Sequence, residues 1–132
     1  MPRIKRAMTV LAATASILTL GFTFSGSAWA GTNGRAWSVK WDNLEDGACD
    51  LQFVSYGDHF YLNDNLKDGA GCYASWEDDA GHTGTFTNTK GAGTTVHRNY
   101  DFPEGASITF EVCITDNGIL WIDTCGKDSA LA

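Results

Sequence analysis

An alternation of apolar and polar side chains over residues 49–64 limits the fold more than any other feature of this chain. It is interrupted once, at residues 57–58, which are Gly-Asp, and then resumes. A period of two places successive side chains on opposite faces of a strand, so we predict a β-hairpin. A two-residue loop that begins with glycine favours a type II′ turn, which would place Phe53 opposite Leu62. Both strands then agree on a core face that holds Leu51, Phe53, Phe60 and Leu62.

The other face of this hairpin collects Val54, Tyr56, His59 and Tyr61. Tyr73, on a later strand, is expected to extend the same face. Tyrosines beside imidazole and amide groups would form a flat platform for a sugar ring or a protein partner. The alternative is that a second sheet covers this face, since a sandwich covers one face of each sheet. The candidate binding residues are therefore Tyr56, His59, Tyr61 and Tyr73.

The first thirty residues have the pattern of a secretory signal peptide. Three basic residues stand among the first six, an apolar stretch covers residues 7–24, and an Ala-Trp-Ala triplet ends at Ala30. These are the three regions that the export machinery reads. A membrane anchor is the alternative, but the Thr and Ser content and the A-x-A ending favour cleavage. We expect residues 31–132 to be secreted as a single β-domain.

The secreted part is strongly acidic. Removal of the three basic leader residues leaves six Lys and Arg against sixteen Asp and Glu, a net charge of −10. Such a surface repels phosphate backbones and anionic lipids, so neither nucleic acid nor a membrane is an expected partner of the mature form. It is compatible with cationic partners or divalent cations, although the charge also serves solubility alone.

The chain carries four cysteines, all beyond the leader: Cys49, Cys72, Cys113 and Cys125. An even number in an exported chain of about this size predicts two disulfides, for which three connectivities exist. We favour Cys49–Cys72 and Cys113–Cys125, because each pair brackets a short turn-rich segment. A zinc site of four thiolates is the alternative, but such sites use C-x-x-C pairs, and the chain has none.

Short alternating segments continue beyond the hairpin and predict strands at residues 37–41, 72–77, 85–87, 94–100, 106–115 and 119–123. No segment has helical periodicity over three turns. The fold is therefore predicted to be all-β, a small antiparallel β-sandwich or partly open barrel of seven to eight short strands with two disulfides. Residues 127–132 are predicted to be a frayed end. The tryptophans assigned to the core are Trp37, Trp41, Trp76 and Trp121.

One pair of predictions conflicts. Residues 116–118 read Asp-Asn-Gly, a strong signal for a two-residue hairpin turn. That turn would place Cys113 opposite Ile122 and not opposite Cys125. Either the loop is longer, or a bulge shifts the register, or the predicted disulfide pairing is wrong.

The sequence holds little that indicates catalysis. The histidines beyond the leader, His59, His82 and His97, form no metal or catalytic spacing. The best metal candidate is the turn at residues 78–82, which has two carboxylates and an imidazole, but turns collect Asp and Gly for backbone reasons alone. No nucleophile motif occurs. We predict no catalytic residue, no metal ligand and no cofactor.

Residues 56–58, 88–94 and 99–105 resemble the small exported β-rich proteins of actinobacteria, most of which have no assigned function. The resemblance covers most of the chain beyond the leader, and its motifs are turns and strands. It implies secretion and an all-β fold, and it implies no catalytic residue. The chain also looks loosely like the secreted amylase inhibitors of the same bacteria, but their Trp-Arg-Tyr triplet is absent.

These observations favour a secreted, monomeric, non-catalytic binding protein whose partner is an extracellular protein or a carbohydrate. The runner-up is an inhibitor of a secreted hydrolase that presents a loop such as residues 64–71. A small extracellular enzyme comes third, because paired carboxylates are recognised only in the folded chain.

Overall fold

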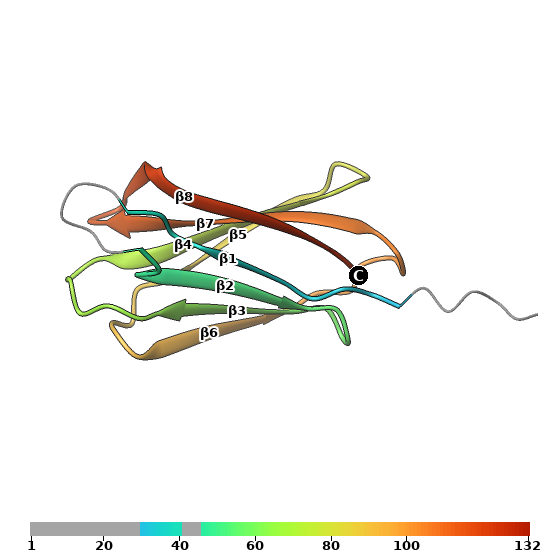
Figure 1. Ribbon diagram of the computed structural model, residues 1–132, viewed down its shortest axis with the longest axis horizontal. Coiled ribbons are helices and arrows are strands. Elements are labelled where there is room, and N and C mark those ends of the chain that lie inside the picture. The colour runs from blue at the N-terminus through green and yellow to red at the C-terminus, as the bar shows by residue number, and fades with distance from the viewer. Residues whose placement is uncertain (1–29, 41–45) are drawn as a thin grey trace, which may run out of the picture.

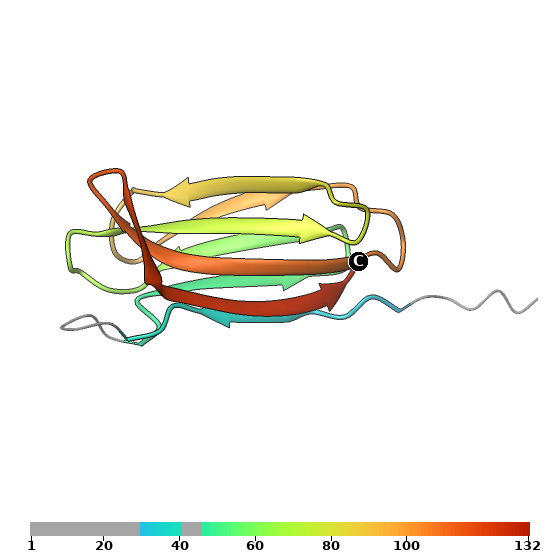
Figure 2. The same ribbon diagram turned by 90° about the horizontal axis from the view of Figure 1, so that it is seen from above.

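The computed structural model describes residues 30–40 and 46–132. They form two four-stranded antiparallel sheets that face each other as a sandwich (Figure 1 and Figure 2). One sheet has the order β1-β2-β3-β6 and the other β5-β4-β7-β8. The strands are β1 (Gly34–Trp37), β2 (Cys49–Val54), β3 (His59–Asp64), β4 (Gly71–Asp78), β5 (Thr83–Asn88), β6 (Thr94–Asn99), β7 (Ser107–Asp116) and β8 (Ile119–Leu131). The predicted all-β sandwich is confirmed. Within the described residues, no helix has the length and apolar character needed to span a membrane.

The core lies between the sheets and uses the predicted alternating positions. The fully buried apolar side chains of the β2–β3 hairpin and of β7 include Leu51, Phe53, Phe60, Leu62, Ile108, Phe110, Val112 and Ile114. Phe60 links the layers, because its ring meets that of Phe110 edge-on at 5.5 Å between centroids. The face assignment of the hairpin is thus confirmed.

The turn of the β2–β3 hairpin differs from its prediction. Phe53 pairs with Phe60, so the loop has four residues, 55–58, and the predicted type II′ turn is wrong. The shift in pairing is two residues, which leaves every side chain on its predicted face. The longer loop is explained by Asp58, which takes a positive φ and accepts hydrogen bonds from the N–H groups of Tyr100 and Phe102. These bonds fasten the loop to the connection between β6 and β7.

The β7–β8 hairpin resolves the conflict in the sequence. Asn117 and Gly118 form the predicted two-residue turn, both with positive φ. A bulge then shifts the register, because Ile114 pairs with Trp121 whereas Val112 pairs with Gly126. The shift places Cys113 beside Cys125. Both predicted disulfides, Cys49–Cys72 and Cys113–Cys125, are present.

The C-terminal segment is not frayed, contrary to the sequence prediction. Residues 127–131 continue β8 along β7, with Ser107 opposite Leu131. Ala132 is buried and exchanges backbone hydrogen bonds with Gly105 and Ala106. The segment was not predicted as a strand because its sequence is largely polar. It forms one because β7 is long enough to pair with it.

The two sheets meet along one edge, where β1 and β8 lie side by side (Figure 1 and Figure 2). Backbone N–H groups of Thr32 and Val39 donate to the carbonyls of Leu131 and Thr124, each at 2.9 Å. Gly126 permits this approach, since a Cβ at that position would lie 1.7 Å from the Trp37 carbonyl oxygen. We call this closed edge the seam.

Candidate functional site

The outer face of the β1-β2-β3-β6 sheet holds two of the four predicted binding residues. His59 and Tyr61 project from β3 on this face, half-buried, and Tyr56 stands in the adjoining hairpin loop with 91% of its surface exposed. The second sheet covers the opposite side of these strands, so no other strand of the described residues covers this face. Tyr73 lies elsewhere: it projects from β4, on the outer side of the other sheet. The expectation that Tyr73 extends this face is wrong, because membership of a sheet is not a local property of sequence.

Tyr61 does not form the flat platform that the sequence suggested. Its ring stacks on His97, the residue opposite it on β6, with centroids 4.8 Å apart and an angle of 17° between the planes. That spacing matches the distance between neighbouring strands, so the rings stand beside each other with faces in contact. His59 completes this cluster, with Nδ1 at 2.8 Å from His97 Nε2.

A buried carboxylate organises the same face near the end where β2 begins. Asp50 is 2% exposed and accepts hydrogen bonds from Arg35 Nε at 3.0 Å, Asn63 Nδ2 at 2.9 Å and Asn65 Nδ2 at 2.7 Å. Arg35 Nη2 also lies 3.0 Å from Asp50 Oδ1. A buried charge needs such a complete set of partners. The arrangement therefore fixes the Arg35 guanidinium on the surface.

Arg35 in turn holds Trp37. The guanidinium carbon lies 5.3 Å from the centre of the indole ring, a cation–π distance. Trp37 is 51% exposed, so its assignment to the core was wrong. Its neighbours Ala36 and Ser38 point inward instead. The Ser38 hydroxyl accepts a hydrogen bond from the Cys49 N–H at 3.0 Å, so this buried polar group has a partner.

The other tryptophans assigned to the core differ in their burial. Trp76 is partly buried against the core, as predicted. Trp121 is 38% exposed, so its assignment to the core is wrong. It lies on the part of β8 before the bulge, among other exposed apolar residues. Trp41 lies outside the described residues.

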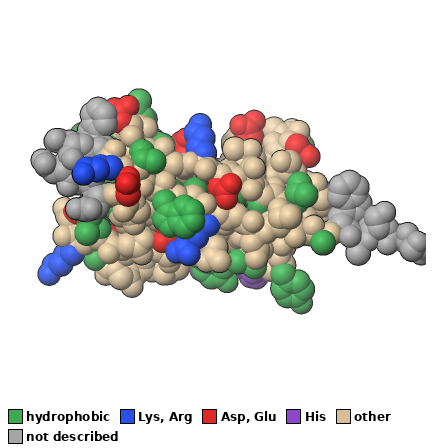
Figure 3. Space-filling view, viewed as in Figure 1, with side chains coloured by type: hydrophobic (Ala, Val, Ile, Leu, Met, Phe, Trp, Pro, Cys, Tyr) green, Lys and Arg blue, Asp and Glu red, His purple; other side chains and the backbone are tan. Residues whose placement is uncertain are grey.

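A shallow groove of about 350 Å³ opens beside Trp37 along the seam. Its walls are formed by Asn33, Gly34, Arg35, Trp37, Gln52 and Asp128. Asp128 is fixed there, because its Oδ2 accepts the Arg35 N–H at 2.8 Å. Figure 3 shows the side of the molecule that carries β1 and β8, where an exposed apolar side chain stands among basic and acidic ones. We call this the Trp37 groove.

A larger hollow of about 820 Å³ lies at one end of the sandwich, between three connections. The connections are β3–β4, β5–β6 and β7–β8, and the lining includes Leu66, Ala70, Thr89 and Asn117. The buried carboxyl of Asp64 stands near the start of the first connection but does not line the hollow. Burial raises its pKa, the Leu66 N–H lowers it, and the Asp68 charge raises it further, with a net upward shift.

The turn at residues 78–82, the best metal candidate in the sequence, uses its carboxylate internally. Asp78 Oδ1 accepts the N–H groups of Ala80 and His82, and Oδ2 lies 2.8 Å from His82 Nδ1. Burial opposes the charged form of Asp78, but the hydrogen bonds and charge of His82, with the Ala80 N–H, outweigh it and lower its pKa. These bonds account for the residues of the turn without a metal.

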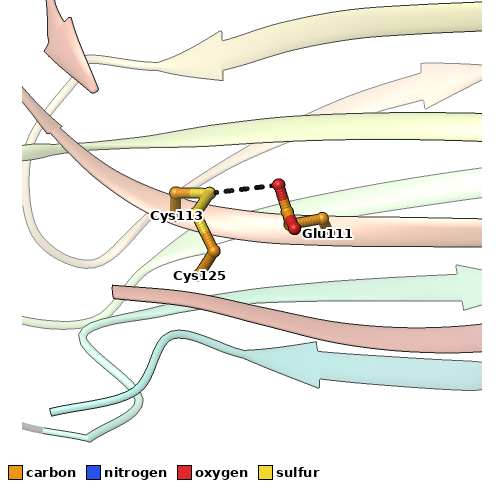
Figure 4. Close-up of side chains that lie close together, drawn as sticks. All are labelled: Glu111, Cys113 and Cys125. Atoms are coloured by element: carbon orange, nitrogen blue, oxygen red, sulfur yellow. Dashed lines mark hydrogen bonds between the residues drawn. A yellow bond between two sulfur atoms is a disulfide. The ribbon is translucent and has the colours of Figure 1, made fainter. Parts of the chain in front are cut away.

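Glu111, Cys113 and Cys125 also lie close together (Figure 4). The Glu111 Oε1 atom is 3.6 Å from Cys113 Sγ, the contact marked by the dashed line in Figure 4. The two sulfurs are joined in a disulfide, so neither is a thiolate that could bind a metal. Glu111 pairs instead with Lys127 across the strands at 3.0 Å.

Comparison of the chain with family models, with curated proteins and with solved structures finds no match. The resemblance to exported actinobacterial proteins therefore stays a prediction.

Sequence reasoning missed three residues of this face: Arg35, Trp37 and His97. The register of β6 against β3 brings His97 to Tyr61, and no local pattern encodes that pairing. For Trp37 a signal existed, because Ala36 and Ser38 are the small residues that a tightly closed edge requires. The alternation of Ala36 and Ser38 with Arg35 and Trp37 allows two orientations of the strand. Either the small side chains or the large ones can face the core.

Proposed function

We propose that this protein is a secreted, non-catalytic binding protein that holds a carbohydrate in the Trp37 groove. One observation carries the proposal: an exposed indole ring, fixed from the buried Asp50 through Arg35, borders a groove lined by amide and carboxylate groups. The indole is 51% exposed, so part of its ring surface is accessible to a ligand.

The chemistry of the groove suits a sugar. The C–H groups on one face of a pyranose carry partial positive charge and are attracted to the negative face of an indole ring. Gln52 and Asn33 offer amide donors and acceptors, and Asp128 offers carboxylate oxygens, for the hydroxyl groups at the rim. The groove is shallow, so one or two sugar units of a chain fit better than an enclosed monosaccharide.

The fixed position of Trp37 adds to affinity. Ordering a side chain on binding costs about 0.5–1.5 kcal/mol, and a ring that is already held avoids part of that cost. Two disulfides suit the oxidising conditions outside the cell, which supports export.

The test is a screen of soluble and insoluble polysaccharides, followed by calorimetry on the best ligand. Trp37→Ala should weaken binding by about tenfold or more, the effect of a central aromatic anchor. Tyr73→Ala, an aromatic truncation on the other outer face, should leave the affinity unchanged. Equal binding by Trp37→Ala and the parent protein would refute the proposal, as would the absence of any carbohydrate ligand.

The inhibitor hypothesis concerns the β3–β4 connection, which begins where β3 ends. The β3–β4 connection is tethered by the Cys49–Cys72 bridge and by the Asn65 N–H, which donates to the Ala48 carbonyl at 2.9 Å. Inhibitory loops need such rigidity. Replacing residues 66–70 with a glycine-serine segment would abolish inhibition of a hydrolase but leave carbohydrate binding intact, which separates the two functions.

A further inference from the structure

Two histidines form a second site on the outer face of the β1-β2-β3-β6 sheet, independent of the Trp37 groove. His59 projects from β3 and His97 from β6, which are hydrogen-bonded neighbours. His59 Nδ1 lies 2.8 Å from His97 Nε2, and the ring centroids are 4.9 Å apart. Both rings come from strands and not from loops, so the backbone sets their separation.

The surroundings hold both rings in place. Tyr61 stacks on one face of His97, with centroids 4.8 Å apart. On the other side of the pair, the His59 ring lies over Gly57, where an added Cβ would be 2.8 Å from Nε2. The absence of a side chain at residue 57 therefore makes room for the imidazole. The strands therefore keep the two imidazoles close together, and a metal bound to both nitrogens would replace the hydrogen bond between them.

We propose that His59 Nδ1 and His97 Nε2 together chelate a Cu²⁺ ion. Neutral imidazole is a good ligand for copper, nickel and zinc. The nitrogen that donates in the present hydrogen bond only has to move its proton to the other nitrogen of the same ring, which leaves the net charge unchanged. His97 is exposed, so water can fill the remaining coordination positions.

The separation of the two nitrogens is compatible with Cu²⁺. With metal–nitrogen bonds of about 2.0 Å, nitrogens 2.8 Å apart subtend about 90° at the metal. That is the angle between neighbouring ligands in the tetragonal geometry of Cu²⁺, whereas tetrahedral Zn²⁺ needs a separation of about 3.3 Å. The order of affinities of divalent metals also places Cu²⁺ first. The net charge of −10 beyond the leader attracts cations in general.

The remaining histidine provides a matched control. His82 carries the same imidazole at the surface, but its Nδ1 is bound to Asp78 and it lies on the β4–β5 turn of the other sheet. If the paired imidazoles bind the metal, substitution of His59 or His97 should weaken Cu²⁺ binding, and substitution of His82 should not.

The experiment titrates the untagged protein with CuCl₂ by calorimetry and by electron paramagnetic resonance. We expect one Cu²⁺ per chain, with a tetragonal spectrum that shows coupling to two nitrogens. His59→Ala and His97→Ala should each weaken binding by more than about tenfold, and His82→Ala should not change it. Tyr61→Ala should weaken binding less, and Tyr61→Phe should preserve it, because the stacked ring only positions His97.

Two results would overturn the proposal. One is retention of the parent affinity for Cu²⁺ in the His59→Ala, His97→Ala double variant, with thermal unfolding showing that the variant is folded. The other is tighter binding of ZnCl₂ than of CuCl₂, which would contradict the assignment of the site to Cu²⁺.

Discussion

The two outer faces of the sandwich are built on the same alternation but carry different chemistry. The face over β5-β4-β7-β8 is dominated by hydroxyl side chains: Ser75, Thr83, Thr85, Thr87, Ser107, Thr109 and Ser129. Threonine fits a pleated surface well, so this face needs no reason beyond the stability of the sheet. The face over β1-β2-β3-β6 carries an indole, a stacked tyrosine, two imidazoles and a buried carboxylate. Such groups are costly to bury or chemically reactive, and their concentration on one side is the reason why both proposed sites are placed on this face.

The largest expected difference between the faces concerns one carboxylate on each. Asp50→Ala should lower the free energy of unfolding by about 3 kcal/mol, because it leaves Arg35 and two asparagine amides without their buried acceptor. Glu111→Ala, which breaks an exposed pair with Lys127, should cost less than about 1 kcal/mol. Urea unfolding measures both. Equal losses would show that the two faces are energetically alike.

The seam, where the faces meet, should be the next most sensitive place. Gly126→Ala forces a Cβ against the Trp37 carbonyl and should cost about 2 kcal/mol, since the backbone of β1 must move. The same shift should weaken carbohydrate binding, because it displaces Trp37. Ser129→Ala, an exposed change on the same strand, should stay within about 0.5 kcal/mol of the parent. A Gly126→Ala variant as stable as the parent would mean that the seam is looser than described.

The two sheets should also differ in how pH affects them. The raised pKa of Asp64 means that the folded chain binds this proton more tightly than the unfolded chain. The contribution of Asp64 to the free energy of unfolding is therefore present at low pH. It is lost as pH rises from about 3.9, the ordinary pKa of aspartate, through the pKa of Asp64 in the folded chain. Asp78 has a lowered pKa, so its contribution is present above the ordinary value and is lost as pH falls through the folded one.

Urea unfolding measured from about pH 3 to pH 6 tests these opposite signs. Asp64→Asn should remove the decline on the alkaline side of this window, and Asp78→Asn should remove a decline on the acid side. Parent-like profiles in both variants would contradict the assignment.

The sequence predicted the part of the fold that depends on local period. Alternation placed Phe53 and Phe60 on the correct face even though the turn between them was wrong, because a shift of two residues preserves the face. The disulfides followed from the small number of cysteines and their spacing.

What the sequence could not predict depends on contacts between distant strands. Trp37 was assigned inward by its residue type, whereas the approach of β1 to Gly126 in β8 leaves room only for small side chains inside. Tyr73 was grouped with Tyr61 although the chain crosses to the other sheet between them. The candidate site was therefore half foreseen: His59 and Tyr61 were named, but Trp37 and His97 emerged only from the register of the folded sheets.

Calorimetry of two aromatic truncations with the best polysaccharide from the screen tests most directly whether Trp37 anchors the ligand. Trp37→Ala should lose about tenfold or more in affinity, whereas Tyr73→Ala should keep the parent value. If Tyr73→Ala loses binding and Trp37→Ala does not, the ligand sits on the hydroxyl-rich face and the central claim is wrong.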